Sequence, residues 1–213
     1  MTAVVDSPTL PSLIAAIDQA NSPEQLMGAV QSLVATQDQA AIPVLIKVLG
    51  YNNPGAAVLA VEGLVQMGDR AVLPLLESLD DYNYGARAYG IRALAAIADP
   101  RALEVLLSSA ETDFAPSVRR AATKGLGQLK WEQLPPDQIQ PAQNRALQSL
   151  TTIALDGDWS LRYAAIVGLE AIAAAANEYC ETVLAILQKI AAQETDRAVI
   201  ARAQWAIAQL TSA

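Results

Sequence analysis

The sequence predicts an all-α protein, an α-solenoid built as a stack of about six helical hairpins. Hydrophobic residues make up 53% of the 213 residues but aromatic residues only 5%, and alanine supplies most of the excess. Alanine favours closely packed helices over strands. Apolar residues recur every three or four positions, which is the spacing of one face of a helix. A short pattern of a small residue followed by an aliphatic one also recurs along the chain, which indicates repeats.

This small-aliphatic pair gives the length of the repeat. Its copies are Ser32-Leu33, Gly63-Leu64, Ala93-Leu94, Gly125-Leu126, Gly168-Leu169 and Ala206-Ile207. Successive aliphatic members are 31, 30, 32, 43 and 38 residues apart. These steps lie in the range of two-helix repeats of the HEAT-like kind. The small residue, glycine in three copies, is expected to let the neighbouring helix approach closely.

Each repeat is expected to begin with a short apolar helix, as at 41–46, 72–76 and 102–107. Pro43 and Pro74 are expected in the first turn of such helices, where a missing N–H does no harm. A polar turn and a second helix of apolar periodicity follow. The sequence therefore predicts one repeat domain over 1–213. The 43-residue step is assigned to a proline-rich loop inserted near 131–141.

Composition excludes several classes of function. A net charge of -8 and a pI near 4.5 make nucleic acid an improbable partner. The chain has no histidine, and its single cysteine, Cys180, forms neither an internal disulfide nor a thiolate metal site by itself. We therefore expect no metal site and no histidine-dependent hydrolase. No apolar segment is long enough to span a membrane, and no secretory signal is present, so a cytoplasmic location is expected.

Two stretches gather the side chains that could bind a ligand. Residues 80–89 and 156–163 each combine aspartate, arginine and aromatic residues at the expected start of a second helix. Second helices line the concave surface of an α-solenoid. The two stretches are therefore expected on that inner face.

Two roles are open for the arginine seven residues before the aliphatic position, which occurs at Arg87, Arg119 and Arg162. It can bond acidic or carbonyl groups of the neighbouring hairpin, and we expect this role for Arg119. For Arg87 and Arg162 ligand binding is the alternative, because each has aromatic neighbours. Asp81 and Asp158 are candidate catalytic residues, and their alternative role is to cap the helices that follow.

The stretch Tyr82-Asn83-Tyr84-Gly85-Ala86-Arg87, together with residues 158–169, resembles the bilin lyases of cyanobacteria, HEAT-like proteins of the phycobilisome. The resemblance covers the whole chain. It is greatest to the F-type (beta) subunit of the E/F-type phycocyanin alpha-subunit phycocyanobilin lyases. It implies a heterodimer with an E-type subunit. This carbon-sulfur lyase would attach phycocyanobilin by a thioether to a cysteine of the phycocyanin alpha chain.

The resemblance also implies how the site would work. Phycocyanobilin is the substrate, no cofactor is permanently bound, and the client protein supplies the thiol, so the lyase acts by positioning. Arginines suit the propionates of the bilin, and aromatic faces suit its conjugated rings. The implied bilin-binding residues are Tyr82, Tyr84, Arg87, Trp159, Arg162 and Tyr163.

Other functions are weighed against the lyase. Some relatives also isomerise the bilin through a motif with histidine and cysteine, which this chain lacks, so isomerase activity is not expected. The main alternative is a non-catalytic HEAT-like scaffold or chaperone in phycobilisome assembly or turnover, and a nucleic-acid enzyme is disfavoured by charge. An apolar face on the terminal helix is expected to seek a partner, and it would comprise Val199, Ile200, Trp205, Ile207 and Leu210.

Overall fold

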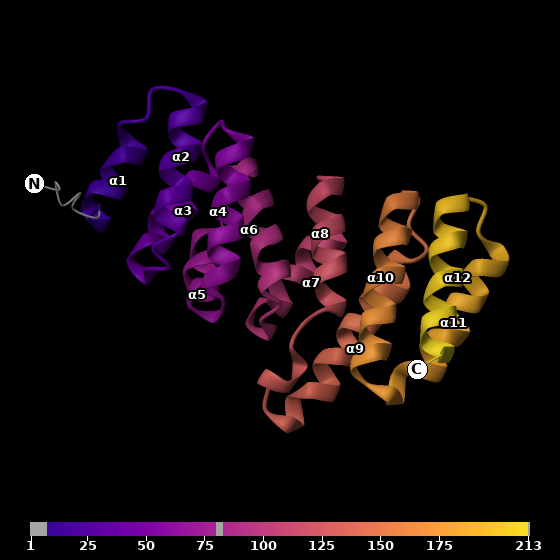
Figure 1. The fold of residues 1–213 in the computed structure, drawn as a ribbon. Coiled ribbons are helices and arrows are strands. Elements are labelled where there is room, and N and C mark those ends of the chain that lie inside the picture. The colour runs from indigo at the N-terminus through magenta and orange to yellow at the C-terminus, as the bar shows by residue number, and fades with distance from the viewer. Residues whose placement is uncertain (1–7, 80–82, 213) are drawn as a thin grey trace, which may run out of the picture. The chain divides into compact units, whose positions relative to one another are not determined.

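The computed structural model describes residues 8–79 and 83–212 (Figure 1). Within these ranges the chain forms twelve α-helices and four short 3-10 helices, and it contains no strand. It divides into two compact units, residues 1–93 and 94–213, which are described separately. The expectation of one domain stays a prediction. None of the helices in the described ranges combines the length and hydrophobicity needed to cross a membrane.

The first unit contains hairpins of a first and a second helix. Its elements are α1 (Leu10–Asp18), α2 (Pro23–Val34), η1 (Gln39–Ala41), α3 (Ile42–Leu49), α4 (Pro54–Met67), α5 (Asp69–Ser78) and α6 (Tyr84–Ile97), which runs past the boundary between the units. Helix α4 packs against α2 and α3. The predicted periodic residues Leu33, Leu45 and Leu64 are fully buried between these helices and form the core.

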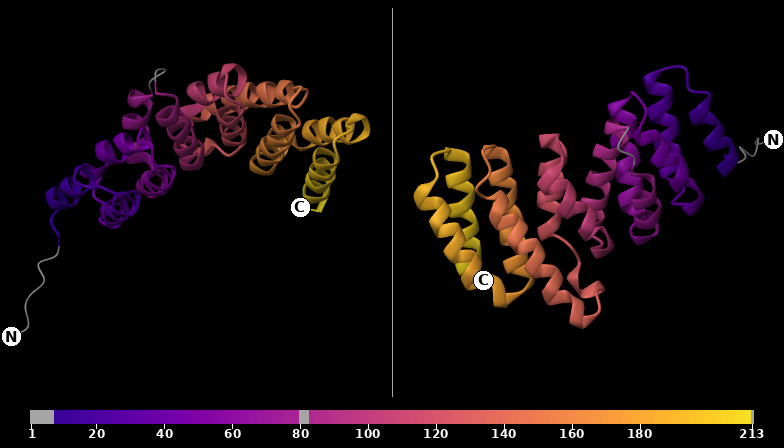
Figure 2. Two further views of the ribbon diagram at one scale, coloured as in Figure 1. Left: turned by 90° about the horizontal axis from the view of Figure 1, so that it is seen from above. Right: turned by 180° about the vertical axis from the view of Figure 1, so that it is seen from behind.

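The second unit continues the pattern with three further hairpins. Its elements are η2 (Pro100–Ala102), α7 (Leu103–Thr112), α8 (Pro116–Gly127), η3 (Trp131–Gln133), α9 (Pro136–Ile153), α10 (Trp159–Ala175), η4 (Asn177–Tyr179), α11 (Cys180–Gln193) and α12 (Arg197–Ser212). Helix α10 packs against both α8 and α12, so these three second helices lie side by side (Figure 2). The predicted all-α stack of helical hairpins is confirmed.

One of the two expectations about a proline in a first helical turn was wrong. Pro43 lies in the first turn of α3 as expected, but Pro74 lies inside α5. The reason is that Gly68 follows the last residue of α4, and its φ of 63° lets the chain reverse at once, so α5 already begins at Asp69. Pro74 therefore has no N–H to offer the preceding turn.

The expected loop near 131–141 is mostly helix. Trp131, whose side chain is buried, is the first residue of a 3-10 turn. Helix α9 then starts at Pro136 and runs for 18 residues. Proline at the first helical position needs no N–H partner, so Pro136 starts the helix rather than preventing it. Pro141 lies inside α9, at the cost of one backbone hydrogen bond. The longer repeat step is accommodated by a longer first helix.

Glycines of the repeat pattern allow close helix packing, as predicted. A Cβ atom on Gly125 would lie 2.6 Å from Cβ of Ala95, and one on Gly168 would lie 2.6 Å from Cδ2 of Leu150. A Cβ on Gly127 would overlap the backbone of Gly168. Helices α8 and α10 thus approach through their backbones, which fixes the spacing of the face that they present.

Candidate functional site

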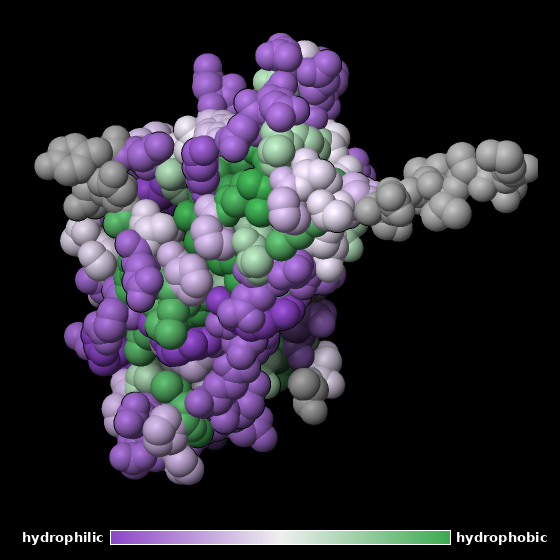
Figure 3. Space-filling model, turned by 90° about the vertical axis from the view of Figure 1, so that its left-hand side faces the viewer, coloured by the Kyte–Doolittle hydropathy of each residue, from purple (hydrophilic) through white to green (hydrophobic). Residues whose placement is uncertain are grey.

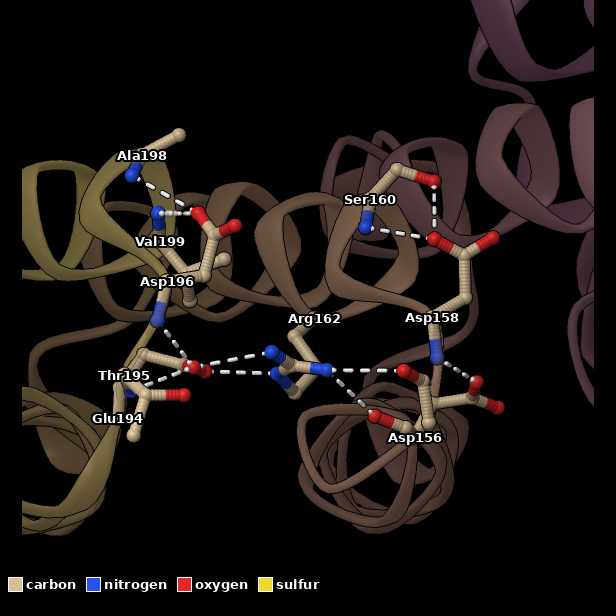
Figure 4. Close-up of polar contacts among 10 residues, drawn as sticks. Asp156, Asp158, Ser160, Arg162, Glu194, Thr195, Asp196, Ala198 and Val199 are labelled. Atoms are coloured by element: carbon tan, nitrogen blue, oxygen red, sulfur yellow. Dashed lines mark hydrogen bonds and ion pairs between the residues drawn. The ribbon is translucent and has the colours of Figure 1, made fainter.

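Arg162 lies in a network that connects two hairpins (Figure 4). Its Nε and Nη2 atoms donate to the two carboxylate oxygens of Glu194 at 2.6 and 2.9 Å. Its Nη1 atom donates to the carbonyls of Asp156 at 2.9 Å and Gly157 at 3.2 Å. A guanidinium has five N–H groups, so these bonds leave one for any ligand. The side chain is 18% exposed, and that of Glu194 is 7% exposed.

Arg119 makes the same kind of connection one repeat earlier. Its Nη2 atom donates to Oδ2 of Asp156 at 2.8 Å, and its Nε donates to the carbonyl of Ala110 at 3.0 Å. The predicted bridging role of Arg119 is confirmed. Arg162 has the contacts of the same role, since Glu194 precedes the next second helix as Asp156 precedes α10. A bilin-binding role for Arg162 stays a prediction.

Asp158 is the N-cap of α10. Its Oδ1 atom accepts hydrogen bonds from the backbone N of Ser160 at 2.8 Å and from its Oγ at 2.7 Å. The side-chain hydrogen bond from Ser160 is the main cause that lowers the pKa of Asp158 below its ordinary value. The carboxyl group is therefore ionised at neutral pH and is poorly suited to donate a proton. The capping alternative is confirmed, and a catalytic role stays a prediction.

A groove of about 810 Å³ lies on the face of α8 and α10, next to α12. This α8–α10 groove is lined by Pro116, Arg120, Lys124, Asp158, Trp159, Ser160, Tyr163 and Ala198. Its volume falls within the range of sites for small organic ligands. It brings together three residues singled out from the sequence, namely Asp158, Trp159 and Tyr163. Arg162 is outside this lining and borders a different pocket.

The two walls of the groove differ in chemistry. Arg120 and Lys124 are four residues apart and therefore share one side of α8. Trp159 and Tyr163 have the same spacing on α10, and Trp159 is 50% exposed. The groove thus places a basic wall against an aromatic one.

Arg202 of α12 supports the ring of Tyr163. Its guanidinium lies 6.0 Å from the centroid of that ring and 4.8 Å from the centroid of Trp205. Arg202 is 9% exposed and is paired with Glu170 of α10. A cation over a ring face is attracted by the negative charge density there. Arg202 therefore holds the ring of Tyr163 in place.

The remaining predicted residues lie elsewhere. Tyr84 begins α6 and is 42% exposed, and Arg87 follows one turn later, partly buried. Both belong to the first unit, whereas the α8–α10 groove belongs to the second. Asp81 and Tyr82 lie outside the described residues.

Arg120 and Lys124 were missed by sequence reasoning, although a signal for Arg120 existed. Arg120 and Tyr163 each lie six residues before the aliphatic residue of their repeats, Leu126 and Leu169. Positions that repeat in this way lie on the same face of successive second helices. Aligning the repeats on the aliphatic residue would have placed Arg120 beside the aromatic wall.

The fold defines a HEAT-repeat protein with a ligand-sized groove on its second helices. The family described as HEAT repeats matches residues 10–84 and 74–170. A computationally designed armadillo repeat protein for modular peptide recognition shares the fold, with a TM-score of 0.56 at 18% identity. That match covers 95% of this chain and 99% of the designed one.

Comparison with known proteins identifies the family within the HEAT-repeat class. The chain is 52% identical to phycocyanobilin lyase subunit beta of Nostoc sp., over 89% of this chain and 94% of that protein. It is 46% identical to phycocyanin alpha phycocyanobilin lyase CpcF of Synechocystis sp., over 95% of each. The solved complex of CpcE and CpcF of phycocyanin lyase from Nostoc sp. contains a chain that matches at 54% identity and a TM-score of 0.76, over 79% of this chain and 99% of that one. This chain belongs to the phycocyanobilin lyase subunit beta family.

Proposed function

We propose that this chain works with an E-type subunit to attach phycocyanobilin by a thioether to a cysteine of the phycocyanin alpha chain. The observation that carries the proposal is the α8–α10 groove, with its aromatic and basic walls, in a chain 52% identical to a phycocyanobilin lyase subunit beta. The names of the relatives support the reaction, and the solved complex of CpcE and CpcF supports the partner.

The reaction requires the lyase mainly to position the bilin and the client thiol. The client thiol adds across the ethylidene double bond of the bilin. Sulfur bonds to one carbon of that bond, the proton goes to the other, and no group leaves. The chain needs no nucleophile of its own. Holding the two reactants close together in the correct orientation accelerates the reaction. Phycocyanobilin is thus a substrate rather than a permanently bound cofactor.

The groove suits this positioning role. Trp159 and Tyr163 offer ring faces against which a flat conjugated bilin can stack. Tyr84 of α6 lies ten residues before Leu94, as Trp159 lies ten residues before Leu169. Tyr84 and its neighbour Arg87 are therefore retained in the proposed bilin-binding set. Tyr82 and Arg162 also stay in the proposed bilin-binding set, and Asp81 and Asp158 stay candidate catalytic residues.

We further place the reaction in the cytoplasm. Thioether formation requires a reduced client cysteine, and cytosolic thiols are kept reduced.

The test is co-production of this chain with an E-type subunit, the apo-phycocyanin alpha chain and phycocyanobilin. Bilin fluorescence on the alpha chain in a denaturing gel is expected only when all four are present. This protein could instead bind the phycocyanin alpha chain while the fluorescence is the same whether or not this protein is present. A non-catalytic scaffold or chaperone would then be the better assignment. A variant of the client cysteine should abolish the signal.

A further inference from the structure

We infer that Arg120 and Lys124 of α8 bind the propionate carboxylates of the bilin and so set its orientation in the α8–α10 groove. The inference rests on the proposed function, since it names how the same ligand would be held. It assigns a carboxylate-binding role to two residues that differ from the arginines singled out by the sequence pattern.

The first argument is the pairing of the charged groups. The arginines at the bridging positions are occupied: Arg119 pairs with Asp156, and Arg162 with Glu194. Arg202 is likewise paired with Glu170. In the part of the chain that the structure describes, Arg120 and Lys124 form no ion pair. Two cations without a carboxylate partner, in a chain of net charge -8, favour an acidic ligand.

The second argument is the orientation of Arg120. Its Nη1 atom donates to Oγ of Ser160 at 3.1 Å, and Oγ in turn donates to Oδ1 of Asp158. This chain of hydrogen bonds ties the guanidinium across the groove from α8 to α10. It uses one N–H group, and four remain for a carboxylate. Asp158 is a nearby negative charge, so we expect the carboxylate to lie on the side of Arg120 that faces Lys124.

The third argument is the match between groove and ligand. A bilin carries two propionates and an extended conjugated system. Each propionate extends from a ring edge on a flexible two-carbon arm. With the rings stacked on Trp159 and Tyr163, these arms can reach the opposite wall, where Arg120 and Lys124 lie one helical turn apart. A guanidinium and an ammonium both form charge-assisted hydrogen bonds with carboxylates.

A second groove in the same unit provides a comparison. It has a volume of about 380 Å³ and lies between α9 and α11, with Leu155, Ile186 and Ile190 in its lining. Its unpaired cation is Lys189, because Arg162 is bonded to Glu194. One exposed lysine on an apolar groove gives no clamp for two carboxylates. Lys189 is therefore a matched control for Lys124, as both are exposed lysines that border a groove.

The experiment measures bilin affinity in the complex with the E-type subunit, by titration of the visible absorption. Two ligands are compared: phycocyanobilin and its dimethyl ester, in which both propionates are uncharged. Arg120→Gln and Lys124→Gln should each weaken binding of the free acid by about tenfold or more. Neither should change binding of the ester. Lys189→Gln should leave both affinities as in the wild type.

The ratio of acid to ester affinity decides the outcome, since a folding defect would weaken both ligands alike. If that ratio is unchanged in Arg120→Gln and Lys124→Gln while bilin transfer still occurs, the inference is overturned and the proposed function stands. If the wild-type complex binds no bilin and transfers none, both are overturned. If Lys189→Gln weakened binding of the free acid as much as Arg120→Gln and Lys124→Gln do, the assignment of propionate binding to α8 would also be overturned.

Discussion

At the scale of single residues, the hydrogen bonds of Arg162 join two neighbouring hairpins and stabilise the fold. Its bonds reach Glu194 and two backbone carbonyls of the α9–α10 linker. Arg162→Leu should lower the free energy of unfolding by roughly 3 kcal/mol, because it leaves a mostly buried carboxylate without its partner. Urea denaturation of the wild type and the variant measures this loss. Arg119→Leu is the matched control and should lose stability in the same way.

The opposite result for Arg162→Leu would indicate that Arg162 binds the ligand. If Arg162→Leu keeps the stability of the wild type but loses bilin transfer, Arg162 binds the ligand as the sequence resemblance implied. The sequence predicted the repeat position of these arginines. It could not predict their acidic partners, because Asp156 and Glu194 lie 37 and 32 residues away in linkers of different length.

The same ion pair predicts how stability depends on pH. The hydrogen bond from Arg162 lowers the pKa of Glu194 from its ordinary 4.5 to about 2. A lowered pKa in the folded state stabilises the fold above the unfolded value, and this contribution is lost as the pH falls toward the folded value. Glu194→Gln should therefore destabilise the chain above pH 4.5. The difference from wild type should shrink between pH 4.5 and about 2.

Denaturant titrations at several pH values follow this difference. A gap between wild type and Glu194→Gln that stays constant through the interval would contradict the assigned ion pair. Glu104 provides a comparison, since it also pairs with an arginine but its side chain is 73% exposed. Glu104→Gln should have a much smaller effect, because exposed pairs contribute little.

At the scale of the elements, the contact between α8 and α10 depends on glycine. A Cβ atom on Gly127 would meet the backbone of Gly168, which cannot move aside as a flexible side chain could. Gly127→Ala should therefore lower the free energy of unfolding by about 1 to 3 kcal/mol through overpacking. It should also weaken bilin binding, because the two helices form the walls of the groove. Thermal unfolding and bilin titration measure the two effects.

Gly28 is the control for helix propensity. It lies in the interior of α2, and an added Cβ would meet no atom within 4 Å. Gly28→Ala should raise stability by about 0.5 to 1 kcal/mol, since alanine is the better helix former. If Gly127→Ala also raised stability, the close helix contact would be wrong.

The sequence predicted the elements better than their ends. The spacing of the small-aliphatic pairs predicted the hairpins, because both members of the pair are buried in the four middle copies. The starts of α5 and α9 were missed because Pro74 and Pro141 were assumed to mark a first turn or a loop. Proline inside a helix costs a hydrogen bond, and tertiary packing can outweigh that cost.

At the scale of the molecule, exposed apolar surface predicts association. Trp205 of the terminal helix is 55% exposed and Ile200, Ile207 and Leu210 are partly buried, whereas Val199, also expected on that face, is buried in the core. Hydrophobic patches are also visible among polar ones on the side of the first unit that carries α1 (Figure 3). Such surfaces favour a partner. Sedimentation should show a complex with the E-type subunit, and a chain that stays monomeric in its presence would contradict this.

The sequence alone could not have assembled the groove. Trp159 and Tyr163 were recognised because aromatic residues are rare in this chain. Arg120 and Lys124 were not, because surface cations on a helix are common and their lack of acidic partners is visible only in three dimensions. Ser160 at the start of α10 connects Arg120 with Asp158, a contact that the sequence pattern did not predict.

Covalent transfer by a pair of tryptophan variants tests the central claim, that this subunit acts by holding the bilin against the α8–α10 groove. Trp159 and Trp205 are similarly exposed, at 50% and 55%, but only Trp159 lines the groove. Transfer is compared with bilin limiting and with enough E-type subunit to keep both variants fully in the complex, as checked by sedimentation, because Trp205 lies on the face expected to bind that subunit. Trp159→Ala should then reduce bilin attached to the alpha chain by about threefold to tenfold, the effect of one lost stacking contact. Trp205→Ala should match the wild type. Equal transfer by Trp159→Ala and the wild type would contradict the claim.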